Sequence, residues 1–289
     1  MTDVAAAVTQ KTDAPFVELL APDGAFARVY LDGAQVASWI PVGGEEQLFV
    51  SERALYGPGV SIRGGVPVCF PQFGPFGALP QHGFARNCRW RLLKSSVPDQ
   101  GRVVFELTPS DMSHELRERM AAWPHDFAAR LLVSVQAAEL SITLEVENTG
   151  TDAFSFTAAL HPYFRVSDSA VALVVGLDGC TYRDALRGGH EFVEQASEVR
   201  FPGNVDRVYY DAPDVLELHD GGRFLRIAKS GFADAVVWNP GAEGTASKTD
   251  FAPGDERHMV CVEAGAVRDP VCLEPRSFWR GTQRMTYGD

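Results

Sequence analysis

The sequence has few cysteines, no long apolar run and no leader-like beginning, and each of these gaps excludes a class of protein. Its five cysteines in 289 residues are odd in number and lie mostly among apolar residues, which is typical of reduced core thiols rather than of a disulfide framework. No stretch approaches the roughly 18 consecutive apolar residues that a membrane-spanning helix needs. The first residues also lack the basic segment and apolar core of a secretory leader. We therefore expect a cytoplasmic protein that binds no membrane.

Basic residues are also in short supply. Lysine and arginine number 26 against 38 aspartates and glutamates, which leaves a formal net charge of -12 at pH 7. Such an acidic balance argues against nucleic acid as a partner. It does not exclude an anionic small molecule, because the charge around a single site decides what binds there.

Several catalytic motifs are missing as well. The sequence contains no G-x-S-x-G nucleophile elbow and no G-x-x-x-x-G-K-[ST] phosphate loop. It also lacks His-x-His, His-x-x-x-His and Cys-x-x-Cys pairs. A zinc or cupin-like site would have to be assembled from distant residues such as His82, His161 and Glu263, and no short spacing supports it. We expect neither a metal nor another cofactor.

Short strand-like segments are what the sequence has in abundance. Residues 141–148, SITLEVEN, alternate between apolar and polar side chains, as a half-buried antiparallel strand should. Only residues 110–122 have a helical pattern. Many short strands without alternating helices predict an all-β antiparallel sandwich or barrel. The predicted strand segments are residues 26–36, 102–108, 127–136, 141–148, 154–160, 171–175, 215–219, 224–228, 235–239 and 259–263.

The chain shows no linker, internal repeat or low-complexity block. All-β architectures often reach this length as one domain. We expect residues 1–14 to be a disordered lead-in and residues 15–289 to form a single β-sandwich domain, working as a monomer.

The segment from residue 60 to residue 92 is rich in proline, glycine, phenylalanine and arginine. Its prolines and glycines exclude a helix, because proline lacks an amide donor and glycine allows tight turns. A long rigid loop that carries cations in an acidic chain predicts an anion-binding pocket. The competing interpretation is that the arginines lie on the surface and the histidine is hydrogen-bonded within the loop. The side chains concerned are Arg63, His82, Arg86, Arg89 and Arg91.

Two further blocks offer groups that could transfer protons. His161 comes directly after an apolar strand and before Pro162, which stops the strand's hydrogen-bond ladder and leaves the ring free to face a cleft. Glu263 lies within the apolar run Val260–Gly265, where burial would raise its pKa toward the range of a general base. A buried structural histidine and a strand-edge glutamate paired with an arginine are the alternatives.

Asp206 follows the turn Gly203-Asn204. An ionised carboxylate accepts hydrogen bonds from two donors, so Asp206 could bind a pair of sugar hydroxyls. An Asx turn without any ligand is the other interpretation.

Taken in the order in which they occur along the chain, these short sequence blocks resemble those of the glucose-6-phosphate 1-epimerases, a group of the aldose 1-epimerase superfamily. The resemblance covers roughly residues 25–285. The specific blocks are Ile62-Arg63-Gly64-Gly65 and Pro80-Gln81-His82-Gly83-Phe84-Ala85-Arg86, and the more widely shared ones are His161-Pro162-Tyr163-Phe164 and Cys261-Val262-Glu263. The resemblance implies a large antiparallel β-sandwich of the galactose mutarotase type. It also implies an isomerase that interconverts the α and β anomers of an aldohexose 6-phosphate, most simply glucose 6-phosphate, without a cofactor.

The resemblance also implies residue roles. Glu263 matches the general base and His161 the general acid. His82 matches a second active-site histidine and Asp206 a ligand of the substrate hydroxyls. Arg63 and Arg86 match the arginines of the phosphosugar branch. The neighbouring Gln81 is also expected to bind substrate.

Two positions depart from the family pattern. Ala264 replaces a frequent proline and is expected to change loop stiffness only, whereas Gly241 replaces a bulky residue and is expected to widen the pocket. A mutarotase of unphosphorylated aldoses and a non-catalytic sugar-phosphate binder remain as alternative functions.

Overall fold

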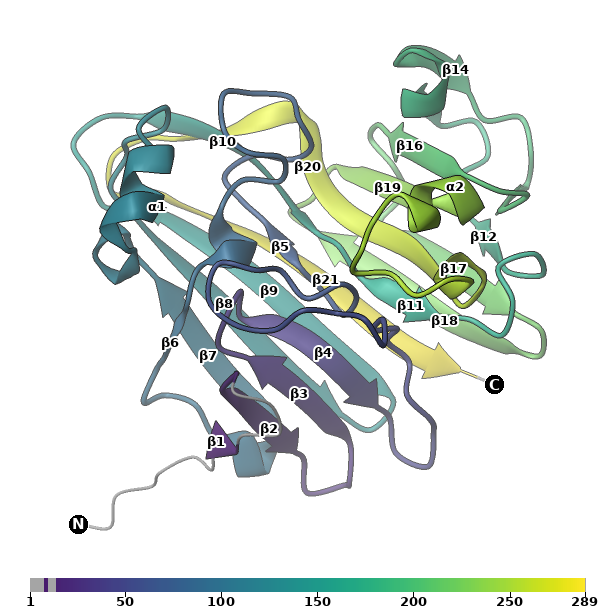
Figure 1. The fold of residues 1–289 in the computed structure, drawn as a ribbon, viewed down its shortest axis with the longest axis horizontal. Helices are drawn as coiled ribbons and strands as arrows, with labels where there is room; N and C mark the ends of the chain where they lie inside the picture. The colour runs from purple at the N-terminus through teal and green to yellow at the C-terminus, as the bar shows by residue number, and fades with distance from the viewer. Residues whose placement is uncertain (1–7, 10–13, 289) are drawn as a thin grey trace.

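The structure, a computed structural model, describes residues 8–9 and 14–288. Most of the predicted lead-in, residues 1–7 and 10–13, lies outside the described residues. Within them the chain forms three antiparallel sheets (Figure 1). The smallest has four strands in sequence order, β1 (Val8–Thr9), β2 (Phe16–Leu20), β3 (Phe26–Tyr30) and β4 (Gln35–Ile40).

The largest sheet has nine strands, and its central strands are long. Strand β9 alternates strictly between buried and half-buried residues, as the pattern of its sequence predicts. The order across the sheet is β15 (Glu198–Arg200), β12 (Leu173–Val175), β17 (Val215–Asp220), β18 (Arg223–Ser230), β21 (Phe278–Gly288), β9 (Glu139–Asn148), β8 (Phe127–Gln136), β7 (Arg102–Leu107) and β6 (Arg91–Leu92).

The third sheet has eight strands and carries Asp206 and Glu263 of the candidate site. Strand β11 (Tyr163–Arg165) pairs with β20 beside the main path of this sheet. Along that path the order is β14 (His190–Val193), β13 (Thr181–Asp184), β16 (Val205–Tyr209), β19 (Asp234–Asn239), β20 (Met259–Leu273), β10 (Phe154–Leu160) and β5 (Val68–Cys69).

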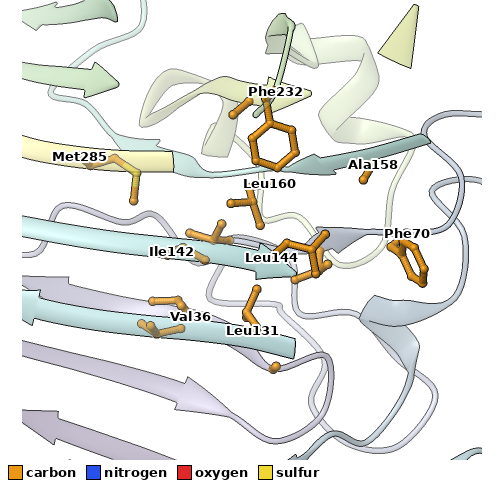
Figure 2. Close-up of a cluster of buried hydrophobic side chains, with 14 of the residues drawn as sticks. Val36, Phe70, Leu131, Ile142, Leu144, Ala158, Leu160, Phe232 and Met285 are labelled. Atoms are coloured by element: carbon orange, nitrogen blue, oxygen red, sulfur yellow. The ribbon is translucent and has the colours of Figure 1, made fainter. Parts of the chain in front are cut away.

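One continuous core joins the three sheets. Isolated bridges tie each of the two smaller sheets to the segments between them: Val36 of β4 pairs with Val66, just before β5, and Phe164 of β11 pairs with Leu48, after β4. Buried residues of all three sheets belong to one cluster. Figure 2 shows buried side chains from β4, β8, β9, β10 and β21 converging in this core, with Val36, Leu131, Leu144, Leu160 and Met285 among them. The predicted all-β sandwich is confirmed.

The described residues contain two α-helices, α1 (His114–Arg119) and α2 (Gly241–Ala246). The predicted helix over residues 110–122 is wrong in extent. A capping box between Thr108 and Asp111 closes a separate 3-10 turn, and Ser113 is extended before it caps α1 by accepting a hydrogen bond from Leu116 N. The 3-10 turns are Ala85–Asn87, Pro98–Gln100, Pro109–Asp111, Ala185–Arg187 and Asp255–Arg257.

Other strand predictions need correction too. Residues 26–36 are not one strand, because a turn with positive φ at Gly33 and Ala34 separates β3 from β4. The strands that were not predicted are β1, β2, β5, β6, β11, β13, β14, β15, β16 and β21. Within the described part of the chain, no helix is long and apolar enough to cross a membrane.

Candidate active site

A cavity of about 520 Å³ lies beside the eight-stranded sheet. Its walls come from β16, β19 and β20, from the end of β10 and from the proline-rich segment 60–92. The cavity brings together every residue that the sequence predicts for the site. These are Arg63, Gln81, His82, Arg86, His161, Asp206 and Glu263.

A break between two strands places His161 against Glu263. Strand β10 ends with Leu160 opposite Ala264, and β11 begins with Tyr163 opposite Cys261, both on the uninterrupted strand β20. The gap at His161 therefore lies opposite Glu263, and Nε2 of His161 is 3.3 Å from Oε1 of Glu263. The predicted stop of the ladder before Pro162 is confirmed, and its consequence is a histidine–carboxylate pair.

Burial governs the protonation of this pair. Only 8% of the His161 side chain and 1% of the Glu263 side chain are exposed. Burial, with the nearby Asp206 charge, raises the pKa of Glu263 well above its ordinary value. Burial, with the positive charges of Arg86 and Arg63, lowers the pKa of His161 well below its ordinary value. The ionised carboxylate is therefore a strengthened base and the imidazolium a strengthened acid, although burial makes each of these charged forms the less favoured one.

The pair also keeps unused hydrogen-bonding capacity. Among the described residues, neither Nδ1 of His161 nor Oε2 of Glu263 has a hydrogen-bond partner, although both atoms are buried. Buried polar atoms without partners are rare in folded proteins, and in a cavity they suit a ligand that supplies the missing bonds. The His161 ring is held in place by Tyr163, which stacks on it at 4.9 Å, and by the edge of Trp238 at 5.8 Å.

The guanidinium of Arg63 is anchored on two sides. It donates to the Tyr163 hydroxyl at 3.0 Å and, through Nε, to Asp250 at 3.1 Å, and it lies over the Phe251 ring at 4.8 Å. Burial lowers the pKa of Arg63, but Tyr163 and Asp250 outweigh it, so the pKa lies above its ordinary value. Arg63 is therefore a fixed positive charge at the cavity wall.

Arg86 lies beside it with donors to spare. Its Nη2 donates to the Gln81 carbonyl at 2.9 Å, while its buried Nε has no partner in the part of the chain that the structure describes. Arg63 and Arg86 also line a second cavity of about 220 Å³. The sequence reasoning missed two further cations that line the main cavity, Arg183 and Lys248, and the pKa of Lys248 is lowered by burial and by Arg63. Such cations suit an anionic group of the ligand.

Asp206 lies inside strand β16, opposite Trp238 of β19, and lines the cavity. Asp206 itself therefore lies in a strand and not in an Asx turn. Burial and the neighbouring Asp184 raise the pKa of Asp206 to about 6. At neutral pH the carboxylate can accept two hydroxyl hydrogen bonds.

The remaining arginines of segment 60–92 are structural. Arg89 pairs with the buried Asp32 at 2.9 Å, and Arg91 pairs with Glu106 at 2.7 Å. Asp250, which holds Arg63, was not predicted either, because it is 187 residues away in sequence and belongs to no motif.

The expectation that Gly241 widens the pocket is wrong. Pro240 and Gly244 line the cavity, whereas Gly241 is not among the described residues that do so. Gly241 has a φ of +62°, and an added Cβ would lie 2.7 Å from the Asn204 backbone nitrogen. The glycine at this position is therefore explained by backbone packing.

Nowhere in residues 8–9 and 14–288 do three or more histidine, cysteine, aspartate or glutamate side chains gather as a metal-binding group. His82, His161 and Glu263 share the cavity, but they do not form the cluster that a zinc site would need.

Comparison with known proteins places this cavity in a family. The sequence pattern described as Aldose 1-epimerase matches residues 15–286. The chain belongs to the aldose 1-epimerase family. A protein of Cenchrus ciliaris, provisionally named a glucose-6-phosphate 1-epimerase, is 39% identical over 260 residues, which are 88% of this chain and 79% of that protein. One from Escherichia coli K12 with the same provisional name is 38% identical over 239 residues, 81% of this chain and 77% of that protein.

A solved structure supports the same family. The crystal structure of a provisionally named mutarotase from Salmonella typhimurium superposes with a TM-score of 0.86 at 32% identity, covering 96% of this chain and 92% of that one. The aldose 1-epimerase family and the mutarotase sandwich expected from the sequence are both confirmed. The protein is thus an isomerase of the epimerase type.

Proposed function

We propose that this epimerase interconverts the α and β anomers of an aldohexose 6-phosphate, with glucose 6-phosphate as the first substrate to test. The observation that carries the proposal is the buried contact of 3.3 Å between His161 and Glu263 in a cavity that Arg63 and Arg86 also line. An acid–base pair can catalyse anomerisation, and the arginines can bind the phosphate. The names of the relatives from Cenchrus ciliaris and Escherichia coli point to the same substrate.

The pair suits the chemistry of ring opening. Glu263 takes the proton from the C1 hydroxyl while His161 gives a proton to the ring oxygen, so the C1–O5 bond breaks and an open aldehyde forms. The aldehyde rotates about the C1–C2 bond, and the reverse proton transfers close the ring on its other face. Both residues return to their starting protonation states, and each would contribute roughly 10²- to 10⁴-fold to the rate.

The cations anchor the far end of the sugar. Arg63, Arg86 and Lys248 would bind the phosphate on C6, so that binding energy remote from the reaction holds the ring while C1 rotates. Asp206 and Gln81 would bind ring hydroxyls from the cavity wall. The proton transfers themselves need no metal ion and no redox cofactor.

The test is the rate at which freshly dissolved α-glucose 6-phosphate reaches anomeric equilibrium, followed by polarimetry or NMR. The wild-type protein should accelerate it, and Glu263→Gln and His161→Ala should each slow the catalysed rate at least about 100-fold. Phe278→Ala, at a side chain that is 63% exposed, is the control and should keep full activity. Near-wild-type rates in both site variants would overturn the assignment of the pair.

The same assay separates the alternatives. Acceleration with glucose or galactose but not with their 6-phosphates would favour a mutarotase of neutral aldoses. Binding of glucose 6-phosphate without any acceleration would favour a non-catalytic binder. We also propose that the enzyme is a cytoplasmic monomer. The five unpaired cysteines, three of them buried, support a reducing compartment, and light scattering of the purified protein tests the monomer.

A further inference from the structure

The His82 ring presents two chemically different edges. Its Nδ1 edge points at the Gly74 backbone nitrogen, which lies 3.3 Å away and donates to it. His82 N in turn donates to the Gly74 carbonyl at 3.1 Å, so the two residues exchange a pair of hydrogen bonds. An amide N–H is only a donor, so it favours Nδ1 as the unprotonated acceptor, but at 3.3 Å this bond is too long to fix the tautomer by itself.

Cys69 adds a second donor to the same nitrogen. It lies on β5, fully buried and opposite Ala159 of β10, and its Sγ is 3.3 Å from His82 Nδ1. Burial raises the pKa of the Cys69 thiol, so the sulfur keeps its proton and can donate. Two donors on Nδ1 leave the ring proton on Nε2.

The Nε2 edge is turned toward the cavity. Burial, with the charges of Arg86 and Arg63, lowers the pKa of His82 to about 3, so the ring is neutral at neutral pH. Nε2 lies 3.4 Å from the side-chain nitrogen of Gln81, an exposed residue that also lines the cavity. Because that nitrogen is only a donor, a proton on Nε2 requires the Gln81 amide to turn its oxygen toward the ring. The His82 ring meets His161 edge to face at 5.7 Å. A neutral donor therefore stands beside the pair that moves protons.

We propose that Cys69 is a positioning residue, which with the Gly74 amide holds His82 in its Nε2–H tautomer as a fixed hydrogen-bond donor to the sugar. The inference rests on the proposed anomerase function. The two histidines then have different roles: His82 donates a hydrogen bond and stays neutral, whereas His161 gives its proton to the ring oxygen. Cys69 is not among the described residues that line the cavity, so it acts on the sugar only through His82.

The first test reads the tautomer directly. Long-range ¹H–¹⁵N NMR of the wild-type protein should show His82 with a pyridine-type Nδ1 and a pyrrole-type Nε2. The His82→Gln variant assigns the signal by removing it from among the seven histidines. A wild-type His82 that carries its proton on Nδ1 overturns the proposal, whatever the activity.

The second test removes the thiol. In Cys69→Ala, His82 should populate both tautomers, and kcat for glucose 6-phosphate should fall about 3- to 10-fold with KM little changed, the effect of one lost hydrogen bond. Cys69→Ser keeps a donor at the same place and should restore the single tautomer and most of kcat. An unchanged tautomer and kcat in Cys69→Ala overturn the role of the thiol.

A matched control removes another buried thiol. Cys88 is 2% exposed and donates to a backbone carbonyl, that of Phe84, at 3.2 Å. Cys88→Ala should leave the His82 signal and kcat unchanged, because its sulfur does not touch His82. If Cys69→Ala fails to fold, the wild-type spectrum and the Cys69→Ser variant still decide the question. The spectrum needs no turnover, so a protein without anomerase activity contradicts the proposed function separately from the tautomer.

Discussion

At the scale of single residues, burial moves the acids and bases of this cavity in opposite senses. It raises the pKa of Asp206 to about 6 and lowers that of His82 to about 3. In both cases burial disfavours the charged form. Because the pKa of each residue differs between the folded and the unfolded chain, the free energy of unfolding depends on pH.

Asp206 gives this dependence a testable sign. The native state raises its pKa from 3.8 to about 6, so the folded protein binds the proton more tightly than the unfolded chain. The stability that comes with the protonated carboxyl is complete below about pH 4 and is lost as the pH rises through 6. Asp206→Asn should therefore be more stable than wild type above pH 6, by on the order of 1–2 kcal/mol, and equally stable below pH 4.

Urea unfolding at pH 4 and at pH 7.5 measures this difference. Asp99→Asn, at an exposed position in the turn Pro98–Gln100, is the control and should show no pH-dependent change relative to wild type. A gain in Asp206→Asn that is equal at both pH values would contradict the raised pKa.

The arginines make a second prediction, about substrate choice. Arg86→Gln should lower kcat/KM for glucose 6-phosphate about 10- to 100-fold, the effect of one charged hydrogen bond, and change that for glucose much less. Arg89→Gln is a matched control, because Arg89 lies in the same segment but pairs with Asp32. The ratio of kcat/KM between the two sugars is the measurement. An equal loss of kcat/KM for both sugars in Arg86→Gln would show that Arg86 does not recognise the phosphate.

At the scale of elements, the break between β10 and β11 creates the site. Strand β20 runs without interruption, and the two shorter strands pair with it on either side of the His161–Pro162 gap. A histidine that leaves the ladder thereby faces a carboxylate that stays in it. Because proline has no amide donor, one residue in the sequence explains the place of the gap.

The turn after Arg63 makes an element-scale prediction. Gly65 has a φ of +63°, and an added Cβ would lie 2.2 Å from the Val36 carbonyl oxygen of β4. Gly65→Ala therefore forces β4 and the arginine-bearing segment apart and should destabilise the protein by about 3–5 kcal/mol. Gly59→Ala, with a φ of +79° but nothing within 4 Å of the added Cβ, should cost only about 1 kcal/mol. Thermal unfolding of both variants is the measurement, and equal losses would contradict the steric argument.

The sequence predicts elements well where one pattern dominates. Strands such as β9 alternate because one face is buried and the other is not. Strand β21 was missed because its polar residues, such as Arg280 and Gln283, carry no such signal, although β9 and β18 hold it between them in the nine-stranded sheet.

The same contrast holds for the site. The residues that stand in recognisable blocks, such as His82 and Glu263, could be predicted to act together. Lys248 and Asp250 could not, because they follow α2 in a segment without a motif. Only the tertiary fold brings Lys248 to the main cavity and Asp250 to the second one. The contact between Cys69 and His82 also needs the folded chain, since it joins a strand to a turn with positive φ.

At the scale of the whole molecule, the core argues for one cooperative unit. A single cluster of buried side chains includes residues of all three sheets, such as Val36, Leu144 and Leu160. Phe70 lies within it and meets Phe84, Trp123, Phe127 and Phe156 at ring distances between 5.3 and 6.1 Å. No sheet can lose its packing without exposing the inner face of another.

The described chain should therefore unfold as the single domain that we propose. Far-UV circular dichroism, tryptophan fluorescence and loss of anomerase activity should share one midpoint in urea. Phe70→Ala should lower the stability by about 3–5 kcal/mol while keeping the three probes coincident, because its cavity weakens all sheets at once. Phe278→Ala, at an exposed ring of β21, should shift the midpoint little. Separate midpoints for the three probes in the wild-type protein would show that the sheets divide into independent units.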